Sequence, residues 1–317
     1  MAPHKRQHNG FALVCVLWVT AMLTVLVIGF GRRAALERRA ASNALDHSQA
    51  MLMARGAVDR GIVELQNRAA LLLLLPEEHR GGTHVGEHWA QSVNLYLEGY
   101  FEQAELFIHD EVAYVIVDED RFININKVPR EILEAIPSIS RSALRRIMAR
   151  RIPEEHAEEE KTPFNVIEEI RYIKGVSEDD WFGNDDDPGL RNILTVWGND
   201  GRININTAPE EVLRCIPGLK SGDISLILNY RANDDGELYS KDDRGFASME
   251  DLSNKTGIVG ASREALDRFC KCTSTYFRIT GVATRDKGKI RAVCAAVVSL
   301  ARGPSIILDW QEKTLGS

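Results

Sequence analysis

The chain has 317 residues, a length that fits two domains or one domain with a large insertion. Charged residues make up 27% of the chain and the hydrophobic set 44%, which is typical of a folded soluble body. The net charge of -7 argues against a dedicated nucleic-acid-binding protein, because such proteins usually carry an excess of basic side chains.

The first predicted element is a membrane-spanning helix. Residues 11–31 carry no charged side chain. A helix of about 20 such residues rises about 30 Å, enough to cross the hydrocarbon core of a bilayer. Lys5 and Arg6 stand before this run and Arg32 and Arg33 after it, so these flanking charges are balanced and do not orient the segment. A secretory signal peptide is the weaker interpretation, because no A-x-A-like cleavage site follows.

The helical pattern continues beyond the apolar run. Small and apolar side chains recur at spacings of three and four residues, which gathers them on one helical face. They are Ala50, Ala54, Ala57, Gly61 and Leu65. No proline interrupts residues 11–75. We therefore expect one long helix whose first half, 11–31, lies in lipid and whose second half, 32–75, packs on a soluble domain.

Strands are predicted on both sides of the middle of the chain. They are runs of alternating or β-branched residues, found at 105–109, 113–117, 121–125, 193–196, 202–205, 276–281, 290–298 and 305–310. Turn-forming residues connect the last three runs, which are therefore expected to form an antiparallel tail.

The middle of the chain contains a duplicated unit. Residues 124–126 read Asn-Ile-Asn, and the same motif returns 80 positions later at 204–206. A downstream segment that starts at Phe164 in the first copy returns at an offset of 82. Apolar side chains at helical spacing predict a helix-hairpin-helix unit in each copy. Thr207 or Asn206 is expected to cap the helix that follows the second motif.

Helix-hairpin-helix pairs elsewhere bind DNA phosphates through backbone N–H groups at a glycine-containing hairpin. The hairpins at 173–176 and 216–220 keep that glycine, whereas Ser138 replaces it in the first hairpin. Arginines gather at 141–151, but the acidic run at 154–160 follows immediately. Such acidity disfavours a phosphate-binding surface, so structural reuse of the motif is the preferred interpretation. A membrane-anchored helix-hairpin-helix DNA-binding protein is the alternative.

Acidic residues in loops are the candidates for a metal site. The local aspartates are Asp185, Asp186, Asp187, Asp234, Asp235, Asp242 and Asp243. No EF-hand spacing is present, so solvated loop charge is the preferred interpretation and calcium coordination the alternative.

The five cysteines are too few for a disulfide-dense scaffold. Cys15 lies in the apolar segment, which leaves Cys215, Cys270, Cys272 and Cys294. Four cysteines allow three connectivities, and nothing in the sequence selects one. Their spacing matches neither a zinc ribbon nor a thioredoxin-like site, so structural thiols or one disulfide are favoured over metal binding.

Enzymatic activity is not expected. The sequence contains no nucleophile elbow, P-loop, HExxH motif or dinucleotide fingerprint. His84 and His88 are four residues apart, but neighbouring glycines make a metal-binding helix there unfavourable.

The start of the chain resembles the processing site of type IV prepilins. Gly10 and Phe11 stand immediately before the apolar helix, and the resemblance implies cleavage between them by the prepilin peptidase and N-methylation of Phe11. That family usually has an acidic residue at the fifth mature position, where this chain has Cys15. The missing carboxylate, the segment at 163–176 and the segment at 201–209 together resemble the K-type minor pseudopilins of the type II secretion system.

This resemblance covers nearly the whole chain and implies an α+β pseudopilin fold. In that fold a long N-terminal helix packs on a small antiparallel sheet, and here a large inserted α-helical domain would hold the two helix-hairpin-helix-like repeats. The expected parts are a leader (1–10), the long helix (11–31 and 32–75), the first part of the sheet (84–123), the inserted domain (124–272, with repeats 124–188 and 204–272 and a strand-like link 190–206) and the last strands (273–317).

The resemblance also implies a location, a role and partners. The chain would be a single-pass protein of the bacterial inner membrane with its body in the periplasm. It would lie at the pseudopilus tip and start filament assembly with the I- and J-type minor pseudopilins, in contact with the prepilin peptidase and the inner-membrane secretion platform. K-type proteins hold calcium in the inserted domain, but the ligands cannot be transferred residue by residue. A related type IV pilus tip subunit is a further alternative.

Overall fold

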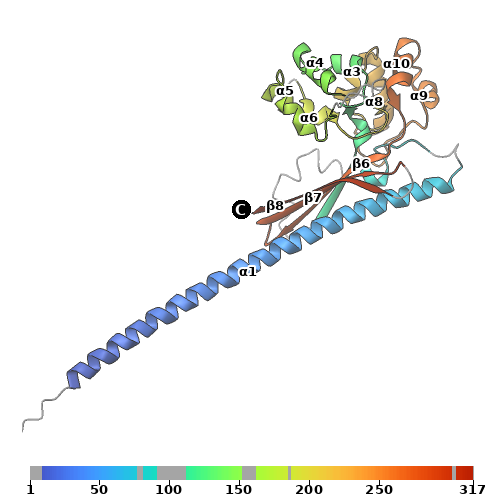
Figure 1. Cartoon of the computed structure of the whole chain (residues 1–317). Helices are drawn as coiled ribbons and strands as arrows, with labels where there is room; N and C mark the ends of the chain where they lie inside the picture. Colours follow the sequence, from blue (N-terminus) through green and yellow to red (C-terminus); the bar gives the residue numbers. More distant parts are fainter. Residues whose placement is uncertain are drawn as a thin grey trace, which may run out of the picture.

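The computed structural model describes residues 9–76, 81–90, 112–151, 162–184, 187–301 and 305–316. A sheet lies along one long helix, and a helical domain lies beyond the sheet, near the end of the helix that is farther from the N-terminus (Figure 1). The strand expected at 105–109 falls outside the described residues.

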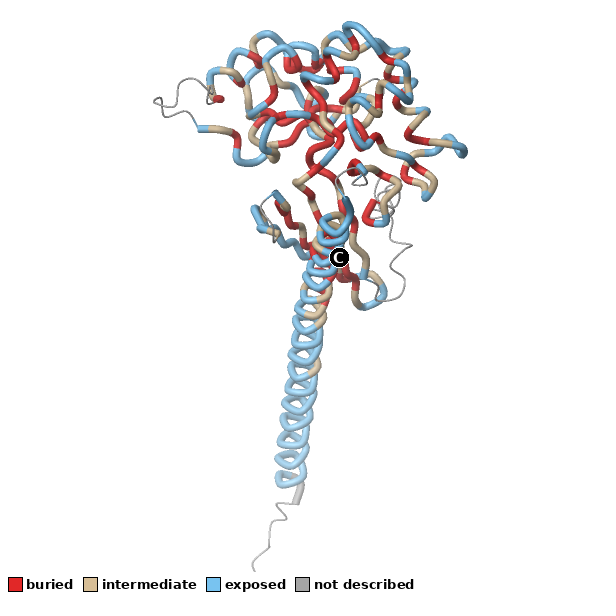
Figure 2. Tube along the Cα trace, turned by 90° about the vertical axis from the view of Figure 1, so that its right-hand side faces the viewer, coloured by how far each residue is buried: buried red, intermediate tan, exposed pale blue. Residues whose placement is uncertain are grey.

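The long helix α1 runs from Asn9 to Leu74 without a break. It ends just before Pro76, which cannot continue a helix because its ring fixes φ and removes the backbone N–H. The stripe of small residues predicted from the spacing is the buried face: Ala50, Ala54 and Leu65 are fully buried. The N-terminal third of α1 is exposed on every side (Figure 2).

Four antiparallel strands form the sheet, in the order β1-β6-β7-β8. They are β1 (Val112–Asp118), β6 (Tyr276–Arg285), β7 (Ile290–Ser299) and β8 (Ile306–Gly316). One face packs on α1, and the resulting core joins α1 side chains to alternate residues of β6 and β7. The three predicted C-terminal strands are thus present, each longer than its sequence pattern indicated.

Glycines set the distance between α1 and the sheet. A Cβ atom on Gly281 of β6 would lie 2.3 Å from the carbonyl oxygen of Ala54, and one on Gly61 of α1 would lie 2.7 Å from Cγ2 of Ile279. Both distances are far below van der Waals contact, so only glycine permits this approach of helix and sheet.

The helical domain is an insertion between β1 and β6, which are neighbours in the sheet. Two short parallel ladders lie within it: β2 (Ile123–Asn124) with β3 (Leu194–Thr195), and β4 (Ile203–Asn204) with β5 (Cys270–Lys271). Its helices are α3 (Arg130–Glu134), α4 (Arg141–Arg150), η5 (Ile167–Tyr172), α5 (Glu178–Phe182), α6 (Leu190–Ile193), α7 (Glu210–Arg214), α8 (Ser221–Ala232), α9 (Met249–Thr256) and α10 (Ala261–Phe269). One apolar core spans both halves of the domain, of which the first runs from β2 to β3 and the second from β4 to β5.

The same asparagine contact occurs in both halves. Asn126 donates from Nδ2 to the carbonyl oxygen of Phe164 at 2.9 Å and accepts from the Phe164 backbone N–H at 2.9 Å. Asn206 makes the equivalent pair of bonds with Phe246, at 2.9 and 2.8 Å. Each asparagine therefore ties the start of its half to a segment about 40 residues further along.

Each half contains a buried arginine that donates hydrogen bonds to backbone carbonyl oxygens near the start of that half. Arg151 donates to the carbonyl oxygens of Asn126, at 3.2 Å, and of Val128. Arg231, 80 positions later, donates to the carbonyl oxygen of Ala208 at 2.6 Å and is fully inaccessible to solvent. Burial disfavours the charged form and lowers the pKa of Arg231 to about 10, so it stays a cation at neutral pH.

Two local expectations differ from the structure. The predicted strand at 121–125 is divided: η4 (Glu119–Arg121) begins at an Asp118 cap, and only β2 remains extended, outside the large sheet. The helix after the second Asn-Ile-Asn motif has Pro209 as its N-cap and no side-chain cap. Neither expected residue is the cap: the Thr207 hydroxyl donates to Asp118, Asn206 Oδ1 accepts from the Phe246 N–H, and no helix N–H donates to a capping side chain.

Candidate functional site

The surface of the N-terminal part of α1 is the first candidate. Large apolar side chains from Phe11 to Phe30 are more than half exposed, and α1 is long and apolar enough to cross a bilayer. In the part of the chain that the structure describes, nothing covers residues 11–31. The segment therefore fits a single-pass membrane anchor.

The predicted processing site lies at the start of this helix. Phe11 stands in its first turns and is 76% exposed. Cys15 is one turn further along, also exposed, with a free thiol. No carboxylate lies between Phe11 and Gly31, so the helix carries no buried charge that would need a cationic partner in lipid. Cleavage after Gly10 and methylation of Phe11 stay predictions.

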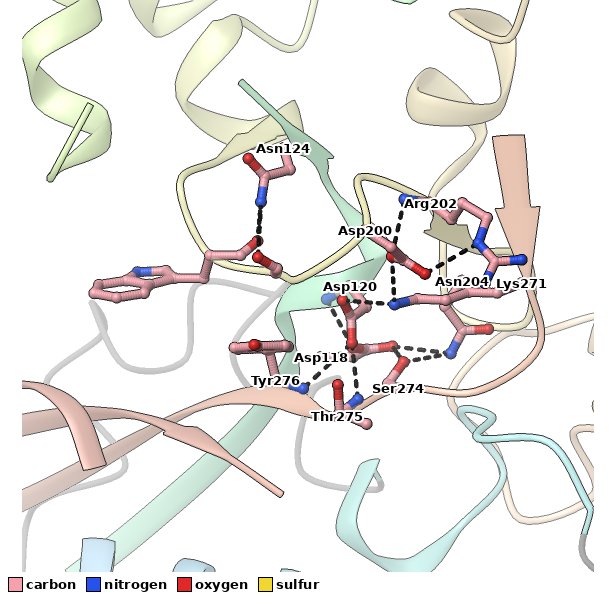
Figure 3. A network of polar contacts seen from close by, with 12 residues as sticks. Asp118, Asp120, Asn124, Asp200, Arg202, Asn204, Lys271, Ser274, Thr275 and Tyr276 are labelled. Carbon is pink, nitrogen blue, oxygen red and sulfur yellow. Dashed lines mark hydrogen bonds and ion pairs between the residues drawn. The ribbon is translucent and has the colours of Figure 1, made fainter. Parts of the chain in front are cut away.

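The second candidate is a buried polar cluster between the sheet and the helical domain, which we call the joint (Figure 3). Asp118, the last residue of β1, is at its centre and 1% exposed. Its Oδ2 accepts from Asn204 Nδ2 at 3.0 Å, from Thr207 Oγ1 at 2.5 Å and from Ser274 Oγ at 2.5 Å. Its Oδ1 accepts from the Asp120 backbone N–H at 2.9 Å. One carboxylate thus connects the end of β1, the second half of the helical domain and the segment that leads into β6.

Burial and the neighbouring Asp120 raise the pKa of Asp118 to about 6, although the hydrogen bonds from Ser274, Thr207 and Asn204 act against this rise. Burial raises the pKa of Asp120 as well. Both shifts favour the protonated forms of these two carboxyl groups.

A lysine offsets part of this negative charge. Lys271 Nζ lies 3.0 Å from Asp120 Oδ1 and 3.2 Å from Asp200 Oδ1. Burial alone would lower the pKa of Lys271, but the two carboxylates raise it above its usual value. Asp120 also accepts the backbone N–H of Thr275 at 2.8 Å, at the start of β6. The joint is thus a polar network, not an apolar interface.

Residues 81–90 also contribute hydrogen bonds to the joint. The Thr83 backbone N–H donates to the carbonyl oxygen of Cys272 at 2.9 Å, and Thr83 Oγ1 accepts from the Ser274 N–H at 3.0 Å. A Cβ atom on Gly82 would lie 2.2 Å from the carbonyl oxygen of Phe246. This glycine lets the segment lie directly on the helical domain before it reaches η2 (His88–Ala90).

The predicted calcium ligands are not gathered into a site among the residues that the structure describes. No group of three or more histidine, cysteine, aspartate or glutamate side chains is placed there so that it could hold a metal ion. Asp185 and Asp186 lie outside the described residues. Asp187 accepts from Ser138 and from the Gly189 backbone N–H, so its carboxylate holds a hairpin of its own half.

The second acidic loop contains a buried carboxylate oxygen with no hydrogen-bond partner in the described structure. Asp243 is 5% exposed, and its Oδ2 accepts backbone N–H groups from Tyr239 and Ser240. Its Oδ1 is buried without a hydrogen-bond partner in the described structure. Asp242 accepts from Ser240, whereas Asp234 is exposed and Asp235 caps a turn. A carboxylate oxygen without a hydrogen-bond partner is suited to bind a cation, so calcium binding stays a prediction for this loop.

The four cysteines of the body are buried free thiols. Burial raises the pKa of Cys215 and of Cys294 to about 11 and that of Cys272 to about 12, and it raises the pKa of Cys270 further. Neutral, buried thiols pack as small apolar groups, and thiolate chemistry is suppressed.

The arginines near the first hairpin are partly committed to the fold. Arg150 pairs with Glu169, and Arg151 is the buried arginine of the first half. Arg141 and Arg145 remain exposed on α4. Gly175 and Gly218 have positive φ values of 106° and 87°, as tight hairpins require. The basic surface left free for phosphate contacts is therefore small.

Comparisons with known proteins place the fold. Neither the protein-family models nor the curated proteins include a match to this sequence. Among solved structures, a chain from the crystal structure of the GspK-GspI-GspJ complex of the enterotoxigenic Escherichia coli type 2 secretion system is similar, with a TM-score of 0.55 and 14% identity. The match covers 86% of this chain and 99% of that chain. This chain has a pseudopilin-like α+β fold.

Sequence reasoning missed the joint as a site. Asp118 and Asp120 gave no signal, because single aspartates at the end of a strand are common. The available signal was Asn204, which recurs with its neighbours at an offset of 80 and is fully buried. A buried asparagine needs hydrogen-bond partners, and those partners come from segments distant in sequence.

Proposed function

We propose that this chain is a minor pseudopilin of a type II secretion system, of the K type. It would stand at the tip of the pseudopilus, start its assembly with I- and J-type minor pseudopilins and so support protein export. One observation carries the proposal: a helical domain is inserted between β1 and β6. It lies across the sheet from α1, near the end of α1 that is farther from the apolar segment (Figure 1).

The position of this domain matters in a filament of parallel long helices. Each additional subunit would place its body above or beside the previous one along the helix axis. The inserted domain occupies the space beyond the sheet, on the side away from the apolar segment. A subunit with such bulk at its distal end leaves little room for another subunit above it, which favours a terminal position.

The structural comparison supports a pseudopilin of this secretion system, and the K type is our proposal within that class. The similar chain belongs to a complex named for K-, I- and J-type proteins, and almost all of it is covered by the match. Because the match also covers 86% of this chain, it takes in more than the α1 and sheet portions alone. The partners proposed for this chain are therefore the I- and J-type pseudopilins of the same secretion system.

Co-purification tests this assignment. The full chain, extracted with mild detergent, should retain the I- and J-type pseudopilins of its own organism, and deletion of its gene should stop export of the secreted proteins. Normal export by the deletion strain together with loss of a type IV pilus would move the assignment to a pilus tip subunit.

The role of residue 15 can be tested separately. A carboxylate at the fifth mature position would allow pairing with the N-terminal amine of a neighbour, which repeating subunits need and a terminal subunit does not. Cys15→Glu should therefore let the protein enter the filament along its length, whereas Cys15→Ser should leave it at the tip. Immunogold labelling of overproduced pseudopili distinguishes the two, and identical labelling would refute the carboxylate argument.

Membrane insertion and processing complete the proposal. The prepilin peptidase would remove residues 1–10, leaving the body in the periplasm and the helix end near the secretion platform. Mass spectrometry of the native protein should find N-methylated Phe11 as the first residue. Gly10→Leu should retain the leader, whereas Asn9→Leu should be processed normally. A native protein that keeps its first ten residues would contradict the assignment.

DNA binding is the second candidate, and the two glycine hairpins with positive φ favour it. A gel-shift titration of the full chain at several salt concentrations decides between them. Binding that weakens steeply with salt, and that Arg141→Gln with Arg145→Gln abolishes, would favour the DNA-binding alternative.

A further inference from the structure

We propose that α1 carries a collar of arginines that binds the phosphate groups of anionic phospholipids around the helix where it leaves the bilayer. The collar consists of Arg32, Arg33, Arg38 and Arg39. It begins at the first residue after the uncharged run and lies on the body side of the membrane segment. This inference goes beyond the role in secretion, and it needs only the membrane anchor.

The collar surrounds the helix. At 3.6 residues per turn, Arg32 and Arg39 point in nearly the same direction, about 20° apart, whereas Arg33 and Arg38 point to other sides. All four side chains are exposed. They span about 10 Å along the helix axis, comparable with the depth of one headgroup layer. The four arginines therefore point to three sides of the helix at the level of the lipid phosphates.

The protein supplies little counter-charge to the collar. Residues 32–39 contain four arginines and one glutamate, which gives a net charge of +3 in a chain whose total is -7. Glu37 pairs with Arg33 at 2.9 Å, and Arg38 donates to the backbone oxygen of Ala34 at 3.3 Å. Arg32 and Arg39 form no ion pair in the described part of the chain.

The charge of the collar also acts against insertion with the body in the periplasm. That orientation is part of the proposed function, on which this part of the inference rests. With the body in the periplasm, the collar is outside and the leader with Lys5 and Arg6 is inside. Positively charged residues near a membrane segment favour the cytoplasmic side, so four arginines outside act against this insertion. Anionic headgroups of the outer leaflet neutralise that charge and offset the penalty.

The position of the collar selects lipid over a protein partner. The collar follows directly on the uncharged residues 11–31, so when those residues lie in lipid the four arginines lie in the headgroup layer. Lipids enclose the helix on all sides. Arginine presents a planar fork that matches phosphate oxygens with two parallel hydrogen bonds. The chemistry recognised is thus a lipid phosphodiester whose headgroup carries no compensating cation.

Lipid titration of the full chain in mild detergent tests the proposal. Phosphatidylglycerol or phosphatidylcholine is added, and native mass spectrometry counts the lipids that remain bound. The wild type should retain phosphatidylglycerol in clear preference to phosphatidylcholine. Each arginine near the surface contributes about 1 kcal/mol, so Arg32→Gln with Arg39→Gln should weaken phosphatidylglycerol binding about 25-fold.

The matched control changes the same charge on the helical domain. Arg141→Gln with Arg145→Gln removes two exposed arginines far from the membrane segment and should leave lipid retention unchanged. Equal loss in both variants would show a response to net charge alone and overturn the proposal. Equal retention of both lipids by the wild type would overturn it too. Displacement of phosphatidylglycerol by millimolar inorganic phosphate would point to a free-anion site instead of a lipid site. Circular dichroism of each variant checks that α1 is intact.

Discussion

Replacement of Asn204 by alanine should loosen the joint much more than the same change at Asn124. The two asparagines occupy the same position in the two halves, 80 residues apart, and both are buried. Each accepts a backbone N–H two residues later through Oδ1, at 2.9 Å for Asn124 and 3.0 Å for Asn204. Only their Nδ2 partners differ, so the pair isolates the joint from the repeat.

The expected difference in unfolding free energy between the two variants follows from the Nδ2 partners. Asn124 Nδ2 donates to the carbonyl oxygen of Trp197 at 2.8 Å, a neutral bond whose loss costs about 0.5–1.5 kcal/mol. Asn204 Nδ2 lies 3.0 Å from the carbonyl oxygen of Thr83 and 3.0 Å from the Asp118 carboxylate. A bond to a charged group is worth about 1.5–3 kcal/mol, and its loss leaves that group buried and under-satisfied. We therefore expect Asn204→Ala to cost about 2 kcal/mol more in unfolding free energy than Asn124→Ala.

Urea denaturation of the full chain in detergent, followed by tryptophan fluorescence, measures both costs. Amide hydrogen exchange should add a local signature: faster exchange at Ser274 and Thr275 in Asn204→Ala, but not in Asn124→Ala. Equal losses of stability, with equal exchange at the joint, would refute the assignment of these contacts to the attachment of the helical domain.

Three further predictions concern packing, pH and calcium. Gly61→Ala should be about 1–3 kcal/mol less stable than Gly56→Ala in urea denaturation. The new methyl group at position 61 would lie 2.7 Å from Ile279, whereas Gly56 faces open space. Equal stability of the two variants would contradict this packing. A carboxyl whose pKa rises to about 6 on folding contributes stability that is fully present below its unfolded pKa and is lost as the pH rises through 6. The Tm should therefore rise from pH 7 to pH 5. Burial raises the pKa of Asp243 to about 6 too, so Asp118→Asn should reduce this rise without removing it, whereas a flat wild-type profile would contradict a raised pKa. EGTA should lower the Tm by a few degrees and Asp243→Asn should abolish that response; an unchanged wild-type Tm would eliminate a structural calcium ion.

Much of the fold was predictable because its signals are local. Residues 11–31 lack charge, and the small side chains after residue 50 recur at helical spacing, so the single long helix and its packing face could be read directly. The C-terminal strands were predictable for the same reason. The strand at 121–125 was misjudged, because Asp118 caps a short helical turn there, and capping by one side chain outweighs weak strand propensity over five residues.

The long apolar helix, the strand tail and the duplication of the Asn-Ile-Asn motif could be read from the sequence alone, since each depends on neighbours within a few residues. Only the tertiary structure decided what the two copies do. Asn124 Nδ2 bonds to the carbonyl oxygen of Trp197, just after β3, whereas Asn204 Nδ2 bonds to Thr83, Asp118 and Ser274 at the joint. The same side chain takes different roles because only the second copy lies against the end of β1, and contacts across such distances along the chain leave no periodic trace in the sequence.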